Sequence, residues 1–437
     1  MNIELLTILL FLAVLLVFAS GLPVSFGLSS IAMIFGIFIW GPQCFKILPH
    51  TALTAVSGFI LLAVPLFLFM GQILHRSGIG EAMFHAMHLL AGRLKGGLAI
   101  GVIIVCSIMG AMVGIIGAGI MTAGSVAIPP MLKRGYNRYL ALGSVMAGGG
   151  MGILIPPSIP MILFSSVTST SIGRMFAGGI IPGFIMAGLF ILYISIRCLV
   201  SPEMGPALPP EERGHFKEKI IALREAALAF SLIFLVLGSI LFGVATPTEA
   251  AAIGALGAAI VAVIYGRFGW KVLKEASINS MKLTAIVVWI LFGAMVFTNF
   301  HMFMGAGNLV KDLMVDLNLG RWGVIILMQL SMLVLGCIMD EFIIVLICAP
   351  LYTPIAISLG FDPIWFGILM ILNMEIAIQT PPYGFALFYL KGIAPKDITM
   401  LDIYKSVTPF LLIKFIVLGL CMAFPEIIVW LPNLLFN

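Results

Sequence analysis

Two short polar segments rich in proline lie inside otherwise apolar sequence, IPPS at 155–158 and TPPYG at 380–384. Proline lacks an N–H and clashes with the preceding helical turn, so each Pro-Pro pair predicts a stretch of unwound helix. Unwinding leaves carbonyl oxygens that suit a cation, and helix N-termini whose amides suit an anion. The chemistry that these residues favour is therefore ion binding rather than covalent catalysis.

Two further apolar segments, 97–133 and 322–358, are each interrupted near the middle. The first contains Gly114, Gly117 and Gly119, and the second contains Asp340-Glu341. Broken backbone at membrane depth is tolerated only where protein or a water-filled cavity surrounds it. Each segment is therefore predicted to be a re-entrant helical hairpin, whose tip faces the Pro-Pro segments. Asp340 is either an ion ligand or a solvated loop residue.

The elements that must position these residues follow from composition. Hydrophobic residues make up 62% of the 437 residues, charged residues only 9%, and the mean hydropathy is +1.20. Apolar runs of about 18 to 25 residues predict a polytopic all-α membrane protein. Membrane spans are expected near 3–20, 24–40, 51–74, 138–168, 176–197, 225–243, 248–265, 283–303, 363–390 and 406–430.

Basic residues predict the orientation in the membrane. With the N-terminus outside, 18 of the 23 Lys and Arg residues fall in cytoplasmic segments, as the positive-inside rule requires. Both termini are then expected on the periplasmic side, and the two hairpins enter from opposite faces. No Lys or Arg is expected at the midplane, where helix N-termini would meet the charge of an anion instead.

The two halves of the chain repeat one pattern. GLPVSFGLSSIA at 21–32 corresponds to VATPTEAAAIGA at 244–255, and IPPSIPMILFSS at 155–166 to TPPYGFALFYLK at 380–391. Inverted-topology repeats with matched broken helices are typical of secondary transporters. Residues 1–200 are predicted to form the first repeat, 201–219 a cytoplasmic linker, and 220–437 the second repeat.

The motifs ATPTEAAAIGA, GGIIPG after IPPSIPMI, and LGFDPIWFGILMILNMEIAIQTPPYGFALF closely resemble the large membrane subunit of tripartite ATP-independent periplasmic (TRAP) transporters, over essentially the whole chain. The resemblance implies a sodium-driven elevator carrier for an organic acid in the bacterial inner membrane. It also implies two partners, a periplasmic binding protein and a small four-helix membrane subunit. It implies no enzyme activity, no nucleic-acid partner and no cofactor besides Na⁺ as the coupling ion.

The resemblance implies a role at the ion site for Asp340 and, second to it, for its neighbour Glu341. Members of the family often have a Ser-rich turn at the first hairpin tip, where this chain has GIIGAG at 114–119, so backbone carbonyls are expected to contribute more. The candidate sodium ligands are Gly114, Gly117, Pro156, Asp340, Glu341, Thr380 and Pro381. The candidate substrate contacts are Ser158, Thr168, Thr380, Tyr383 and Glu375.

Several motifs have simpler structural interpretations. Thr246-Pro247-Thr248-Glu249 is typical of a capping box, Gly148–Gly152 of close helix packing, and Asn373 of a hydrogen bond between helices. Glu375 either lines the site or contacts a neighbouring helix. Residues 75–95, with three histidines, indicate an amphipathic segment at the cytoplasmic surface rather than a metal site.

Two other interpretations stay open. The first is a stand-alone Na⁺- or H⁺-coupled symporter of a related fold, which would need no binding protein. The second is a passive channel or a membrane-embedded enzyme. A channel would need a continuous polar stripe, and an enzyme would need a cluster of His, Ser or Asp, which this sequence with its six His lacks.

Overall fold

The computed structural model describes residues 3–209, 215–305 and 320–436, and the described secondary structure is helical throughout. The first half contains α1 (Ile3–Ala19), α2 (Val24–Trp40), α3 (Ile47–Ser57), α4 (Ala63–Arg76), α5 (Ile79–Ala91), α6 (Gly97–Val113), α7 (Ile116–Lys133), α8 (Arg138–Gly150), α9 (Ile159–Thr168) and α10 (Ile172–Val200). The second half contains α11 (Phe216–Leu241), α12 (Pro247–Ile264), α13 (Trp270–Phe303), α15 (Gly320–Gly336), α16 (Glu341–Ser358), α17 (Pro363–Ala377), α18 (Phe385–Ile393), α19 (Met400–Ala423) and α20 (Glu426–Leu435).

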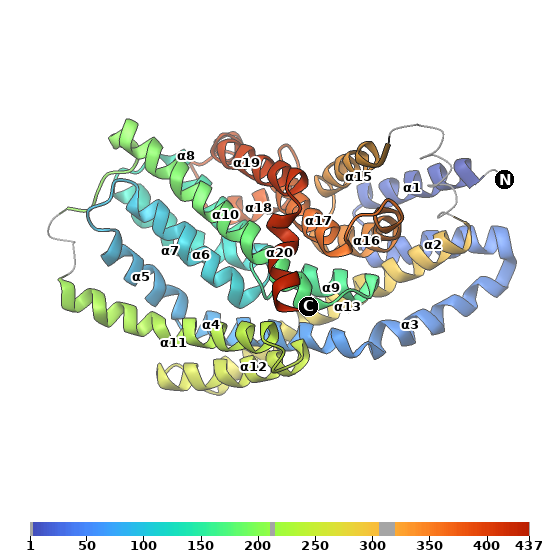
Figure 1. The fold of residues 1–437 in the computed structure, drawn as a ribbon, viewed down its shortest axis with the longest axis horizontal. Coiled ribbons are helices and arrows are strands. Elements are labelled where there is room, and N and C mark those ends of the chain that lie inside the picture. Colours follow the sequence, from blue (N-terminus) through green and yellow to red (C-terminus); the bar gives the residue numbers. More distant parts are fainter. Residues whose placement is uncertain (1–2, 210–214, 306–319, 437) are drawn as a thin grey trace.

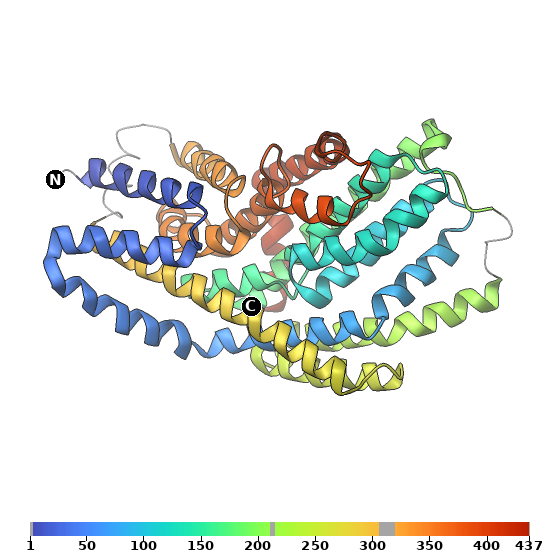
Figure 2. The same cartoon turned by 180° about the vertical axis from the view of Figure 1, so that it is seen from behind.

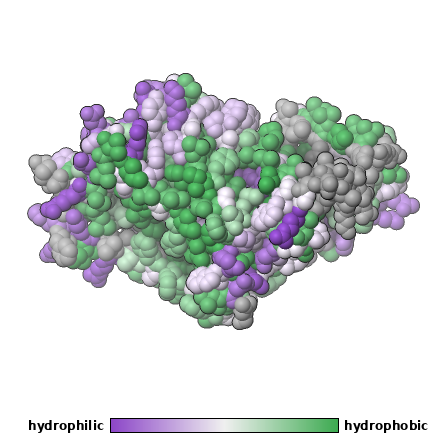
Figure 3. Space-filling view, turned by 45° about the horizontal axis from the view of Figure 1, so that its top comes forward, coloured by the Kyte–Doolittle hydropathy of each residue, from purple (hydrophilic) through white to green (hydrophobic). Residues whose placement is uncertain are grey.

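Apolar surface covers much of the molecule. Among the described residues, seven helices are long and apolar enough to cross a membrane. Hydrophobic residues dominate the middle of the face in Figure 3, and hydrophilic residues gather at its left end and lower edge. Large side chains such as Phe38 and Phe234 are more than 70% exposed, which a soluble protein would rarely tolerate as a contiguous surface. The prediction of a polytopic all-α membrane protein is confirmed.

Helices of the two halves correspond in order. α6–α7 corresponds to α15–α16, α8–α9 to α17–α18, and α10 to α19. In Figures 1 and 2 the pair α6–α7 and the pair α15–α16 approach the middle of the molecule from opposite ends, with α9, α17 and α18 between them. The division into repeats at 1–200 and 220–437 stays a prediction, with residues 210–214 of the linker outside the described part.

The hairpins lie where the sequence predicts them. The first consists of α6 and α7, which cover 97–133 except for a break at Gly114-Ile115, and the second consists of α15 and α16. Tight packing against the following helix fixes both. A Cβ added at Gly110 would lie 2.6 Å from the Cα of Gly152, and one added at Gly336 would lie 2.4 Å from the Cβ of Ala377. These pairs occupy matching positions in the two halves.

Some predicted spans differ from the observed helices. The span expected at 51–74 is interrupted at Gly58, whose extended backbone separates α3 from the short helix Phe59–Leu62 that leads into α4. The span expected at 283–303 begins at Trp270, and α11 begins at Phe216 inside the predicted linker. The last span ends at Ala423, because Pro425 cannot continue α19 and starts α20 instead.

The structure confirms the capping box, the hydrogen bond of Asn373 and the close packing at Gly148–Gly152, while the placement of residues 75–95 at the cytoplasmic surface stays a prediction. Thr246 and Glu249 form a capping box, in which the Thr246 N–H donates to Glu249 Oε2 at 2.8 Å. Asn373 Nδ2 donates to Gln329 Oε1 of α15 at 2.6 Å. A Cβ at Gly149 would lie 2.9 Å from the Ile120 amide nitrogen, so the glycine run lets α8 approach the first hairpin. Residues 79–91 form α5, whose buried face packs on α6 and α11.

Candidate functional site

The first hairpin tip lies directly on the first Pro-Pro break. α6 ends at Val113, and its C-cap Gly114 has a φ of +67° and an N–H that donates to Gly110 O at 2.8 Å. A Cβ at this position would lie 2.7 Å from the carbonyl oxygen of Pro157, and the Ile159 N–H donates back to Gly114 O at 3.5 Å. Glycine is required here both for the left-handed backbone and for the close approach.

The second hairpin tip is capped by an acid. Asp340 is the N-cap of α16, and its Oδ1 accepts from the Phe342 N–H at 3.0 Å. Glu341 is the first residue of the helix and is 4% exposed, whereas Asp340 is partly exposed. Carboxylates at a helix N-terminus are favoured by the free amides and the helix dipole.

The two tips converge because the hairpins pack across the halves. α7 packs on α18, and α16 packs on α9, so each hairpin contacts the second part of the other half's broken helix. Tyr389 of α18 is the side chain between them. A Cβ added at Gly117 would lie 2.8 Å from Cε2 of the Tyr389 ring. Tyr389 is also close enough to Asp340 and Glu341 to interact with their charges.

Within the described part of the chain, the acidic pair at the second hairpin tip forms no ion pair with a basic side chain. The carboxyl groups of Asp340 and Glu341 are close enough to interact with each other. Two adjacent, largely buried carboxylates repel each other and lose hydration. This arrangement favours binding a cation or a proton between them.

Backbone oxygens at the breaks complete the set of donors. Within the described residues, the carbonyl oxygens of Pro156 and Pro381 accept no hydrogen bond, while Pro382 O accepts from the Tyr404 hydroxyl at 2.7 Å. The Thr380 hydroxyl donates to Ile376 O at 2.8 Å, which leaves its lone pairs available. Carbonyl, hydroxyl and carboxylate oxygens are the ligands that hard cations prefer.

The other candidate residues lie in different environments. Ser158 is fully buried as the N-cap of α9, with its hydroxyl donating to Ile153 O. Thr168 is the last residue of α9 and donates to Phe164 O at 2.7 Å, and Tyr383 in the second break is 58% exposed. Gly117 lies in the first turn of α7, where free amides rather than free carbonyls are expected. Their ligand roles stay predictions.

Glu375 forms an ion pair that the sequence reasoning missed. Its Oε1 lies 2.9 Å from Nζ of Lys414, and both side chains are fully buried. Lys414 also donates to Gln379 Oε1 at 2.8 Å. The expectation of no Lys or Arg at the midplane did not account for Lys414, which lies in the middle of α19 and contacts Glu375 of α17. An ionisable residue inside an apolar span was the available signal.

Comparison with known families assigns this architecture. Residues 9–427 match the model of the family described as tripartite ATP-independent periplasmic transporter, DctM component. The chain belongs to this family. It is therefore a membrane transport subunit of a TRAP system and not an enzyme.

Two relatives of this TRAP subunit align over almost their whole length. The C4-dicarboxylate TRAP transporter large permease protein DctM of Vibrio cholerae is 32% identical, covering 98% of each chain. The sialic acid TRAP transporter large permease protein SiaM of the same organism is 30% identical, covering 95% of this chain and 96% of that protein. The crystal structure of the Alcanivorax borkumensis YdaH transporter is similar in fold, with a TM-score of 0.58, 17% identity and 89% of each chain covered.

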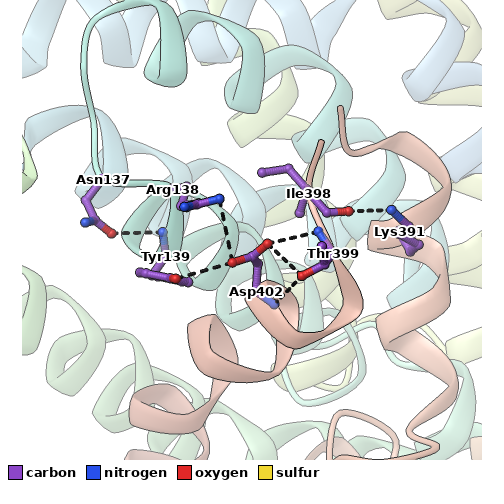
Figure 4. A network of polar contacts seen from close by, with 7 residues as sticks. All are labelled: Asn137, Arg138, Tyr139, Lys391, Ile398, Thr399 and Asp402. Atoms are coloured by element: carbon purple, nitrogen blue, oxygen red, sulfur yellow. Dashed lines mark hydrogen bonds and ion pairs between the residues drawn. The ribbon is translucent and has the colours of Figure 1, made fainter. Parts of the chain in front are cut away.

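A second polar network joins the two halves of the TRAP subunit away from the hairpin tips (Figure 4). Asp402 of α19 accepts from the Thr399 hydroxyl at 2.7 Å and the Tyr139 hydroxyl at 3.3 Å, and Arg138 of α8 lies 3.7 Å from it. Lys391 of α18 donates to Ile398 O in the adjoining loop. Because Arg138 is half exposed, this network contributes mainly to fixing the start of α19 on α8.

Proposed function

We propose that this chain carries a small organic acid anion into the cell by sodium-coupled secondary active transport, as the transport subunit of an inner-membrane TRAP system. The observation that carries the proposal is the carboxylate pair Asp340-Glu341 at the second hairpin tip, which forms no ion pair within the described residues. A cation bound there relieves the repulsion between the two carboxylates and the cost of burying them.

Sodium coupling supplies enough free energy for accumulation. A tenfold Na⁺ gradient provides about 1.4 kcal/mol per ion, and 100 mV adds about 2.3 kcal/mol per charge moved inward. Two ions would provide about 7 kcal/mol, of which an entering monoanion returns about 2.3 kcal/mol to the same voltage. The remainder of about 5 kcal/mol corresponds to accumulation of several thousandfold.

Each residue group has a distinct part in the proposed cycle. Asp340, Glu341, Thr380 and the carbonyls of Pro156 and Pro381 offer oxygens to Na⁺. The Tyr383 N–H in the second break, which donates no hydrogen bond within the described residues, is offered to the substrate carboxylate. The two hairpins close over this region, and the family supports delivery of substrate by a periplasmic binding protein and assembly with a small membrane subunit. Both termini are proposed to lie on the periplasmic side.

The acidic pair also fits a proton, so a proton-coupled symporter without a binding protein is the second candidate. The distinguishing experiment is uptake of a panel of organic acids into proteoliposomes containing the chain and its small subunit. With the periplasmic binding protein present, an inward Na⁺ gradient at constant pH should drive accumulation, and a pH gradient with K⁺ in place of Na⁺ should not. Accumulation driven by the pH gradient alone would favour the second candidate, and downhill flux without either gradient would exclude a coupled carrier.

A further inference from the structure

Three polar side chains form a fully enclosed cluster next to the second break. Lys414 of α19 lies 2.9 Å from Glu375 and 2.8 Å from Gln379, which are one helical turn apart on the segment leading out of α17. Glu375 and Lys414 have no exposed surface, and Gln379 is 1% exposed. With no path to solvent in this conformation, the pair cannot bind substrate directly.

The first half of the chain makes room for this cluster. A Cβ at Gly150, the last residue of α8, would lie 2.1 Å from Gln379 Nε2, 2.9 Å from Glu375 Oε1 and 3.0 Å from Lys414 Nζ. The cluster therefore lies where α8, α17 and α19 meet, and it depends on the missing side chain at position 150.

The cluster is also an asymmetry between the halves. At the offset that relates the Pro-Pro segments, Glu375 corresponds to Gly150 and Gln379 corresponds to Leu154. At the offset that relates Pro182 to Pro409, Lys414 corresponds to Ala187. The second half thus has an acid, an amide and a base where the first half has two small residues and an apolar one. Buried ionic groups in an apolar span are costly, so a function for the second break is the default explanation.

Gln379 connects the cluster to the candidate sodium ligands. It directly precedes Thr380 and is two residues before Pro381, whose carbonyl accepts no hydrogen bond among the described residues. We infer that Glu375 and Lys414 are positioning residues, which hold Gln379 on α19 and so fix the ligands at Thr380 and Pro381 without touching the ion. This inference rests on the proposed sodium coupling.

A merely structural role would be to join α17 to α19. The chain contains a matched control for that role, because the Trp365 indole of α17 donates to Cys421 O of α19 at 2.9 Å, near the opposite end of α17. Removing this bond weakens the same helix pair at a distance from the break. If changes in the Lys414 cluster reduce sodium affinity and loss of the Trp365 hydrogen bond does not, weaker packing of α17 on α19 cannot explain the reduction.

The experiment measures sodium-dependent thermal stabilisation of the purified full chain with its small subunit in detergent, with choline at equal ionic strength as reference. In Gln379→Leu, which keeps the ion pair and introduces the side chain found at Leu154, the Na⁺ concentration for half-maximal stabilisation should rise about tenfold or more. This is the scale on which outer-shell partners change metal affinity. Glu375→Gln/Lys414→Gln should show the same rise, and Trp365→Phe should melt lower with an unchanged half-maximal concentration.

The outcomes distinguish a failure of the positioning role from a failure of the proposed sodium coupling. If Gln379→Leu is stabilised by Na⁺ at the wild-type concentration, the positioning role is wrong. An equal rise in Trp365→Phe would reduce the cluster to helix packing and also overturn it. If the wild type itself shows no stabilisation by Na⁺ over choline, the proposed sodium coupling fails instead.

Discussion

Replacing Gly150 by alanine tests whether the buried ion pair is rigid. The new methyl group would lie 2.1 Å from Gln379 Nε2 and within 3.0 Å of Glu375 Oε1 and Lys414 Nζ. Each of these atoms ends a flexible side chain, which on a surface would swing away at little cost. Here the three side chains hold one another and are enclosed, so any movement lengthens a contact between buried charges.

The expected magnitude follows from two opposing effects. Alanine in place of a helical glycine normally stabilises by about 0.5–1 kcal/mol. Overpacking of a dense interior costs about 1–3 kcal/mol, and separating buried charges adds to that cost. We therefore expect Gly150→Ala to be destabilised by about 1–2 kcal/mol, whereas Gly188→Ala on α10, where a Cβ would meet nothing within 4 Å, should be slightly stabilised.

Thermal unfolding of the purified chain in one detergent provides the assay. Gly150→Ala should melt about 1–2 °C below the wild type, and Gly188→Ala at or above it. Adding Gln379→Ala to Gly150→Ala removes the closest clash, so the double variant should lose less than the sum of the single losses. If Gly150→Ala melts as high as Gly188→Ala, the cluster is loosely packed and the ion pair is not held rigidly.

Three further predictions concern other parts of the chain. Lys414→Met leaves the Glu375 carboxylate buried without a partner and should lower stability by about 3–5 kcal/mol, whereas the double change to Met at both positions should be close to wild type; equal melting temperatures for the two variants would contradict this. Asp340→Asn should raise the Na⁺ concentration for half-maximal uptake about tenfold or more, because a bond to a charged group contributes about 1.5–3 kcal/mol; an unchanged sodium dependence would remove Asp340 from the site. Thr246→Ala removes the cap of α12 and should cost about 0.5–2 kcal/mol; a melting temperature equal to wild type would show that the cap contributes nothing.

Local sequence signals were sufficient for much of the architecture. Gly114 and Asp340 mark hairpin tips because a left-handed glycine and a helix-capping acid each end or start a helix through their own backbone. The Pro-Pro segments predict breaks for the same local reason. The interruption at Gly58 was not predicted. Gly58 has a negative φ, as glycines inside helices do, so its residue type alone does not distinguish it from them; its surroundings do.

The contacts between distant segments could not be predicted from the sequence. Lys414 falls inside the apolar span expected at 406–430, and only the packing of α19 on α17 brings it to Glu375, 39 residues away. Similarly, Tyr389 had no local signal, and its place between the two tips depends on α7 packing on α18. Pairing of this kind is set by tertiary structure, which a single sequence does not specify position by position.

The most direct test of the account is uptake of organic acids into proteoliposomes that contain this chain with its small membrane subunit. Sodium and the periplasmic binding protein are each supplied or omitted, and the voltage is held constant. Accumulation is expected only when an inward Na⁺ gradient and the binding protein are both present. Equal accumulation without the binding protein, or without sodium, would contradict it.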